Sequence, residues 1–125
     1  MMDRGVKITL GGEEYFLLLT TGATKALSKR YNGLENLGEK LMAGETVDVA
    51  LDEVAWLLVT LINQGVAYEN RICGASKKPL TVEDIDLLTS PAELIELKSA
   101  ISDAMLMGMK RNIISEDDEK NAAGE

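Results

Sequence analysis

This 125-residue sequence contains no histidine, and it has only one cysteine, two prolines and one phenylalanine. Without histidine it lacks the side chain that most often acts as a general base near neutral pH and most often ligates metals. The single cysteine, Cys73, cannot form an intrachain disulfide and has no histidine to activate it. Zinc sites need several cysteine or histidine ligands. The sequence therefore predicts no metal site, no cofactor and no enzymatic activity.

Concentrated positive charge is also lacking. Lysine and arginine number 13 against 21 aspartate and glutamate residues, which gives a formal net charge of −8. The basic residues are scattered, with no run longer than Lys77-Lys78 or Lys110-Arg111. Nucleic acids and anionic membranes are normally bound by basic patches. The sequence therefore predicts neither nucleic acid nor membrane as a partner.

Long apolar runs are absent as well. The longest, residues 54–62, is interrupted by Thr60 and is far shorter than the roughly 20 residues that cross a bilayer. The first five residues lack the apolar stretch of a signal peptide. Neither GxxxxGK[ST] nor GxGxxG, the common phosphate-binding motifs, is present. We therefore expect a soluble protein of the cytoplasm.

The first part of the sequence has a pattern typical of a β-hairpin. Residues 6–10 alternate between apolar and polar side chains, and Gly11-Gly12 suits a two-residue turn. Residues 5–19 are therefore expected to form a hairpin with a return strand from Glu14 to Leu19, in which Leu10 lies opposite Glu13 and Val6 opposite Leu17. The more polar face then carries Lys7, Thr9, Glu14, Phe16 and Leu18. Either a helix or strand covers Phe16 and Leu18, or they form a site for another chain.

The rest of the sequence predicts about five helices. They are residues 21–31, residues 34–42, a long helix from Asp48 or Asp52 to about Tyr68, residues 82–88, and a helix from Ser90 to near Lys110-Arg111. The long helix is apolar almost all round, which is typical of a central helix covered on several sides. Gly65 within it either allows close packing or ends the helix early. Thr81 and Ser90, each followed three residues later by an acid, are expected to cap the last two helices.

The end of the sequence has a different composition. Residues 116–125 contain five acidic residues and no large apolar side chain, which predicts disorder. We therefore expect a mainly α fold, in an α+β sense, with an N-terminal β-hairpin. Residues 1–112 are predicted to form a single helical domain, and residues 113–125 a disordered acidic tail.

Methionines near the end of the last predicted helix are candidates for a binding surface. Met105, Met107 and Met109 are two residues apart, so they spread around the helix and cannot share one face. Methionine side chains adapt to irregular partners. We hypothesise that Phe16, Leu18 and these three methionines help to form a protein-binding or self-association surface. Packing in the core is the alternative for each of them.

Three segments, taken in order, carry a family resemblance. They read VKITLGGEEYFLLLTTGATKALSKRYNGLENLGEKL, LDEVAWLLVTLINQG and PLTVEDIDLLTSPAELIELKSAISDAM. In this order they resemble the tail assembly chaperones of long-tailed phages and prophages from Gram-positive hosts. The resemblance covers about residues 5–110 and rests on the order and character of the segments.

The resemblance implies a small, helix-rich, non-enzymatic protein that binds the tape measure protein and helps the tail tube protein to polymerise around it. It further implies action in the host bacterial cytoplasm and absence from the mature virion. Many members of the family also exist in a longer form made by ribosomal frameshifting. Two other functions stay open: a small structural tail or head–tail protein retained in the virion, and an acidic regulatory adaptor.

Overall fold

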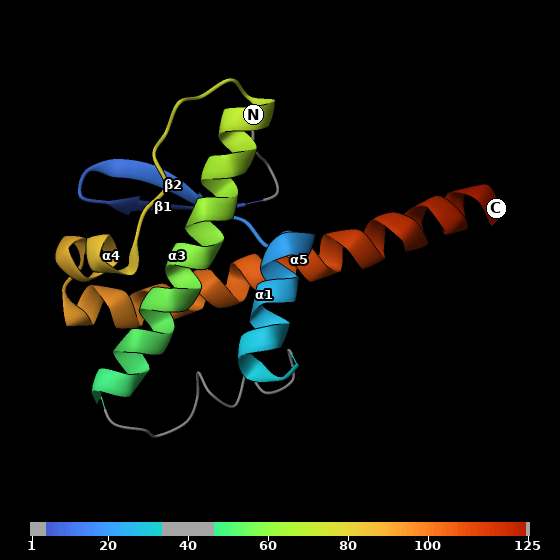
Figure 1. The fold of residues 1–125 in the computed structure, drawn as a ribbon. Helices are drawn as coiled ribbons and strands as arrows, with labels where there is room; N and C mark the ends of the chain where they lie inside the picture. Colours follow the sequence, from blue (N-terminus) through green and yellow to red (C-terminus); the bar gives the residue numbers. More distant parts are fainter. Residues whose placement is uncertain (1–4, 34–46, 125) are drawn as a thin grey trace.

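The computed structural model describes residues 5–33 and 47–124, with side chains over residues 5–33 and 51–108. This part of the chain forms a two-stranded hairpin and four helices, in the order β1, β2, α1, α3, α4 and α5 (Figure 1). The predicted class, mainly helical with an N-terminal hairpin, is therefore confirmed. The sequence predicts about five helices, and the additional one, residues 34–42, lies outside the described residues.

The hairpin forms in the predicted register. β1 (Val6–Leu10) pairs antiparallel with β2 (Glu13–Leu17), so that Leu10 lies opposite Glu13 and Val6 opposite Leu17. Gly11 and Gly12 have φ values of 55° and 85°, the left-handed values that this two-residue turn requires. The buried face carries Ile8, Leu10, Tyr15 and Leu17.

Helix α1 (Thr21–Tyr31) follows directly. The hydroxyl of Thr20 accepts a hydrogen bond from the backbone N–H of Ala23 at 3.0 Å. Thr20 is therefore the N-cap, and it lies one residue before Thr21, the first residue of the predicted helix. Asn32, with φ 60°, ends the helix in the left-handed conformation. The residues that α1 buries are four apart, which places them on one face: Ala23, Leu27 and Tyr31.

Helix α3 (Val47–Ile72) is the centre of the fold. It contacts β2, α1, α4 and α5, and Figure 1 shows it crossing in front of α5. Its fully buried side chains include Leu57, Leu58, Leu61 and Ile62, as an all-round apolar helix predicts. The helix continues past Tyr68, so Gly65 does not end it. Gly65 allows close packing instead.

The last two helices begin with the predicted caps. At the start of α4 (Val82–Leu88), the N–H of Asp84 donates to the Thr81 hydroxyl at 3.2 Å, and the Thr81 N–H donates to the Asp84 carboxylate at 2.9 Å. Ser90 and Glu93 make the same reciprocal pair, at 3.2 and 3.0 Å, at the start of α5 (Pro91–Gly124). Each pair satisfies backbone donors that a helix start leaves open.

The end of α5 differs from the prediction. The helical backbone runs to Gly124, so the predicted end near Lys110-Arg111 is wrong. Cations near a helix end contribute only about 0.3–1 kcal/mol, too little to stop a helix by themselves. Figure 1 shows the final turns of α5 projecting beyond the other elements. Disorder of residues 113–125 in solution stays a prediction, because a projecting helix gains no stability from tertiary packing.

A single aliphatic core joins these elements. Each described helix and strand contributes to it, and so does the connection after β2. Burying one such side chain stabilises the fold by about 1.5–3 kcal/mol relative to leaving it exposed. The fully buried large side chains are Leu17, Leu18, Leu27, Leu57, Leu58, Leu61, Ile62, Ile85, Ile101 and Val54.

Candidate functional site

The structure places the two predicted hairpin residues in different surroundings. Phe16 lies half-buried on the outer face of β2, opposite Lys7 of β1. Leu18 is 0% exposed, and its backbone N–H donates to the carbonyl of Leu61 in α3 at 3.2 Å. In the folded chain Leu18 therefore belongs to the core, and of the two only Phe16 offers surface to another molecule.

The predicted methionines lie on α5. Met105 and Met107 are both half-buried, and Met105 packs against the core. The side chain of Met109 lies outside the described residues. The hairpin and methionine regions meet through backbone packing, because a Cβ built on Gly108 would lie 2.7 Å from Cβ of Leu19. That Phe16 and the methionines form one binding surface stays a prediction.

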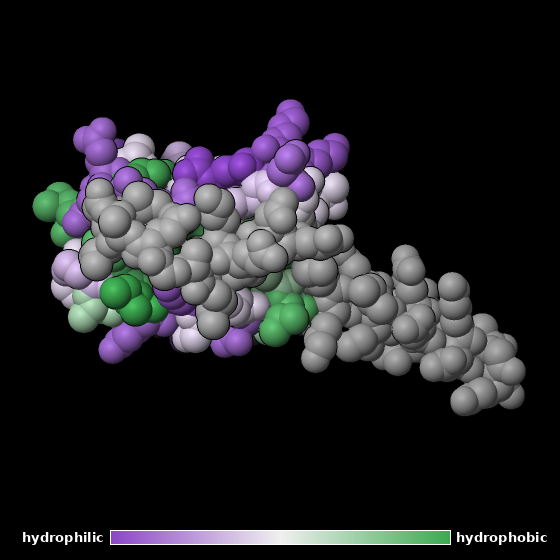
Figure 2. All heavy atoms as spheres, turned by 90° about the horizontal axis from the view of Figure 1, so that it is seen from below, coloured by the Kyte–Doolittle hydropathy of each residue, from purple (hydrophilic) through white to green (hydrophobic). Residues whose placement is uncertain are grey.

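Among residues 5–33 and 51–108, four large apolar side chains are exposed that the sequence analysis did not single out. They are Ile72 (63% exposed), Leu87 (84%), Ile95 (49%) and Leu106 (56%), on α3, α4 and α5. In Figure 2 hydrophobic atoms appear at separate places on the face seen from below. Leu106 stands between Met105 and Met107 on α5.

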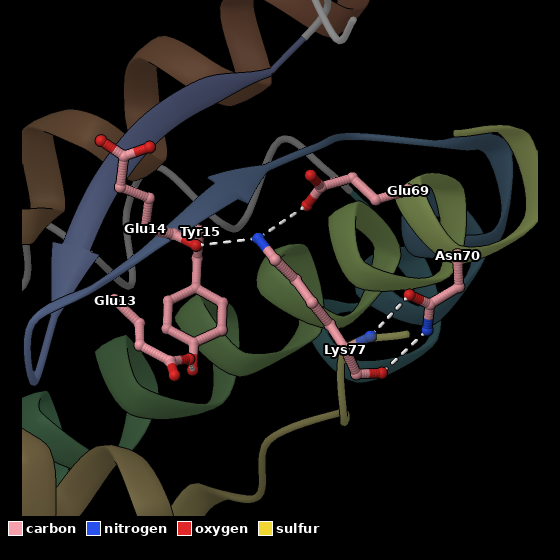
Figure 3. Close-up of polar contacts among 6 residues, drawn as sticks. All are labelled: Glu13, Glu14, Tyr15, Glu69, Asn70 and Lys77. Atoms are coloured by element: carbon pink, nitrogen blue, oxygen red, sulfur yellow. Dashed lines mark hydrogen bonds and ion pairs between the residues drawn. The ribbon is translucent and has the colours of Figure 1, made fainter. Parts of the chain in front are cut away.

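A hollow lies between β2 and the α3–α4 loop, residues 73–81. It has a volume of about 690 Å³. Figure 3 shows Lys77 reaching across it: its Nζ donates to the carbonyl of Glu14 at 2.9 Å and to the Glu69 carboxylate at 3.1 Å. The ammonium also lies 5.4 Å from the ring centre of Tyr15. Lys77 is thus occupied in joining the hairpin to α3, and is not available as a nucleophile or general base.

Two asparagines of α3 bind the backbone of the α3–α4 loop. The amide of Asn70 bonds both the N–H and the carbonyl of Lys77, each at 2.8 Å (Figure 3). The amide of Asn63 bonds both backbone groups of Leu80 in the same way, each at 2.7 Å. Asn63 and Asn70 are seven residues apart and so share one helix face. The α3–α4 loop therefore lies along α3 in a defined position.

A second polar cluster joins α1 to α3. The Arg30 guanidinium pairs with the Glu53 carboxylate at 2.8 Å and lies 4.3 Å from the ring centre of Trp56. Tyr31 meets Trp56 edge to face, with ring centres 6.1 Å apart. Burial, followed by a hydrogen bond with Glu53, raises the pKa of the Tyr31 phenol. These groups hold two helices together by cation–π and aromatic contacts.

The chemistry that these residues can perform is limited. Burial and a 3.0 Å hydrogen bond to Glu13 raise the pKa of the Tyr15 phenol, so it stays protonated at neutral pH. Cys73 is exposed. Among the described residues no group of three or more acidic, cysteine or histidine side chains is arranged to hold a metal. No helix in the described ranges is long and apolar enough to cross a membrane.

No protein-family model, curated protein or solved structure matches this chain.

Proposed function

We propose that this chain is a phage tail assembly chaperone that binds the tape measure protein and promotes polymerisation of the tail tube protein. It acts without catalysis, in the host bacterial cytoplasm, and is left out of the mature virion. The proposal follows the resemblance of the hairpin, the central helix and the capped helices to this family.

The observation that carries the proposal is the exposure of large apolar side chains on helices of an acidic chain. Leu87 and Leu106 are 84% and 56% exposed, although Ile85 on the same helix as Leu87 and Ala104 on the same helix as Leu106 are fully buried. Burying such a side chain against a partner helix is worth about 1.5–3 kcal/mol. A client with long apolar helices offers the complementary surface. The net charge of −8 keeps chains with exposed apolar groups soluble.

Co-expression with a tape measure protein of a long-tailed phage tests the proposal. We expect this chain to keep the tape measure protein in the soluble fraction and to co-purify with it. The double variant Leu87→Asp and Leu106→Asp should lose co-purification, since both side chains are exposed and their replacement leaves the core intact. Ser28→Asp, which adds a charge at an exposed site of α1, is the matched control and should behave like wild type.

Two further measurements separate this function from its alternatives. Deletion of the gene should abolish tails of normal length, and mass spectrometry of purified particles should find no peptides of this chain. Peptides at a stoichiometric level in mature particles would instead establish the structural tail or head–tail protein. Co-purification that survives the Leu87 and Leu106 double variant would remove the exposed leucines from the binding surface.

A further inference from the structure

The two edges of the hairpin are treated differently by the rest of the fold. In an antiparallel pair, successive residues point their backbone N–H and C=O groups alternately toward the partner strand and away from it. Leu10 and Glu13 flank the two-residue turn and form hydrogen bonds with each other through their backbone groups. Because the direction alternates, the backbone N–H and C=O groups of Glu14 and Phe16 point away from β1. The Glu14 carbonyl accepts the 2.9 Å hydrogen bond from Lys77, which agrees with this assignment.

The outer edge of β2 is covered by α3 and its loop. Beyond the Glu14 contact, the Phe16 carbonyl faces α3 so closely that a Cβ built on Gly65 would lie 2.1 Å from its oxygen. The next outward N–H, that of Leu18, bonds the Leu61 carbonyl. No room remains on this edge for another strand.

The outer edge of β1 is open. By the same alternation, Lys7 and Thr9 direct their backbone groups away from β2, and both residues are exposed. Within residues 5–33 and 51–108 no other residue forms a hydrogen bond with these backbone groups. The strand Val-Lys-Ile-Thr-Leu has neither proline nor a bulge, and its one charged side chain, Lys7, is paired with Glu14 of the same chain at 3.3 Å.

We propose that the β1 edge pairs with the β1 edge of a second copy of this chain, antiparallel and about a two-fold axis at Ile8. Lys7 then exchanges two backbone hydrogen bonds with Thr9 of the second copy, and the symmetry repeats them. All five residues of β1 find a partner in this register. The two hairpins become one four-stranded sheet.

Side-chain chemistry selects this register and this partner. On the inner face, Ile8 meets Ile8 of the second copy, and Val6 meets Leu10 of the second copy, so apolar pairs with apolar. On the outer face, Lys7 lies opposite Thr9 of the second copy. Glu14 of the second copy is the cross-strand neighbour of that Thr9. Each Lys7 is already paired with Glu14 of its own chain at 3.3 Å. A shift by two residues in one direction would set Lys7 opposite Lys7, which is unfavourable, and in the other direction would set Val6 opposite Gly12 of the turn, where it has no strand partner.

Cross-linking tests both the partner and the register. Lys7→Cys and Thr9→Cys are made separately in a Cys73→Ser background, and each is oxidised alone and as a mixture. Opposed residues in this sheet have Cα atoms about 5.5 Å apart, which suits a disulfide. We expect a disulfide-linked dimer in the mixture only. Self-linkage of Lys7→Cys or of Thr9→Cys would overturn the register, and absence of linkage in all three samples would overturn the proposal.

A second measurement needs no cysteine. Thr9→Pro removes an outward N–H that β1 does not use within the hairpin, so the fold should survive, whereas Thr9→Ala keeps that N–H. Sedimentation at roughly 0.15 M salt, where charge is screened beyond about 8 Å, should show wild type and Thr9→Ala as dimers. Loss of these bonds in Thr9→Pro should raise the dissociation constant roughly tenfold or more. A monomeric wild type, or a Thr9→Pro dimer of unchanged affinity, would refute the proposal whatever the client-binding result.

Discussion

Replacing Gly65 with alanine should destabilise this protein, although the same change in most helices is stabilising. Gly65 lies inside α3, where β2 crosses it, and a Cβ at this position would lie 2.1 Å from the Phe16 carbonyl oxygen and 3.1 Å from the carbonyl carbon. Carbon and oxygen atoms normally approach no closer than about 3.3 Å. The strand and the helix would therefore have to separate by roughly 1.2 Å, the difference between 3.3 and 2.1 Å.

The size of the effect follows from two opposing contributions. Alanine is favoured over glycine in a helix interior by about 1 kcal/mol. Overpacking a well-packed site costs about 1–3 kcal/mol, occasionally more. The upper end applies here because the obstacle is backbone, and because moving it displaces the fully buried Leu17 and Leu18. The expected net loss is about 2 kcal/mol, which lowers Tm by roughly 8 °C for a domain of this size.

Urea and thermal unfolding of three glycine variants check this reasoning. Gly22→Ala is the matched control, since its Cβ would meet nothing closer than the Gln64 side-chain oxygen at 3.4 Å. It should stabilise the protein by about 0.5–1 kcal/mol. Gly108→Ala, with Leu19 atoms at 2.7–3.1 Å, should fall between the other two. If Gly65→Ala proved as stable as Gly22→Ala, the close crossing of β2 over α3 would be disproved.

Three other predictions concern the loop, the helix end and the pH response. Asn63→Ala removes both bonds to the Leu80 backbone and should cost about 1–3 kcal/mol in urea unfolding, while Asn70→Ala should mainly accelerate proteolysis of the α3–α4 loop. Backbone amides of residues 113–124 should exchange hydrogen at unfolded-chain rates, and deletion of residues 113–125 should leave Tm unchanged; protected amides there would contradict this. Because burial raises the pKa of Tyr31, the folded chain keeps the phenol proton above pH 10.0, where the unfolded chain releases it. The free energy of unfolding should therefore fall as pH rises above about 10, and Tyr31→Phe should reduce that slope.

Local interactions made much of the fold predictable. The hairpin register follows from a two-residue period and a Gly-Gly turn, both contained in twelve consecutive residues from Val6 to Leu17. The starts of α4 and α5 follow from side chains that bond backbone groups three residues away. In each case sequence neighbours determine the geometry, so the sequence pattern alone was informative.

Features that depend on distant parts of the chain were not predictable. Leu18 was assigned to the outer hairpin face because the alternation was extended past Leu17, where β2 ends and the chain turns into the core. Which of Met105, Leu106 and Met107 is exposed depends on which elements reach α5, and a helix pattern does not contain that information. Asn63 and Asn70 bond to loop residues that are seven or more positions away in the sequence. No local sequence pattern therefore indicated that these two asparagines position the loop.

The proposed client surface and the proposed self-association edge lie on different elements, and this makes them separable. The outer edge of β2 is used by α3, so of the two edges of this sheet β1 alone can extend it, whereas Leu87 and Leu106 lie on α4 and α5. Thr9→Pro should therefore give a monomer that still co-purifies with the tape measure protein. Leu87→Asp with Leu106→Asp should give a dimer that does not. If both variants lost both properties, client binding would depend on dimer formation, and the two surfaces would act as one.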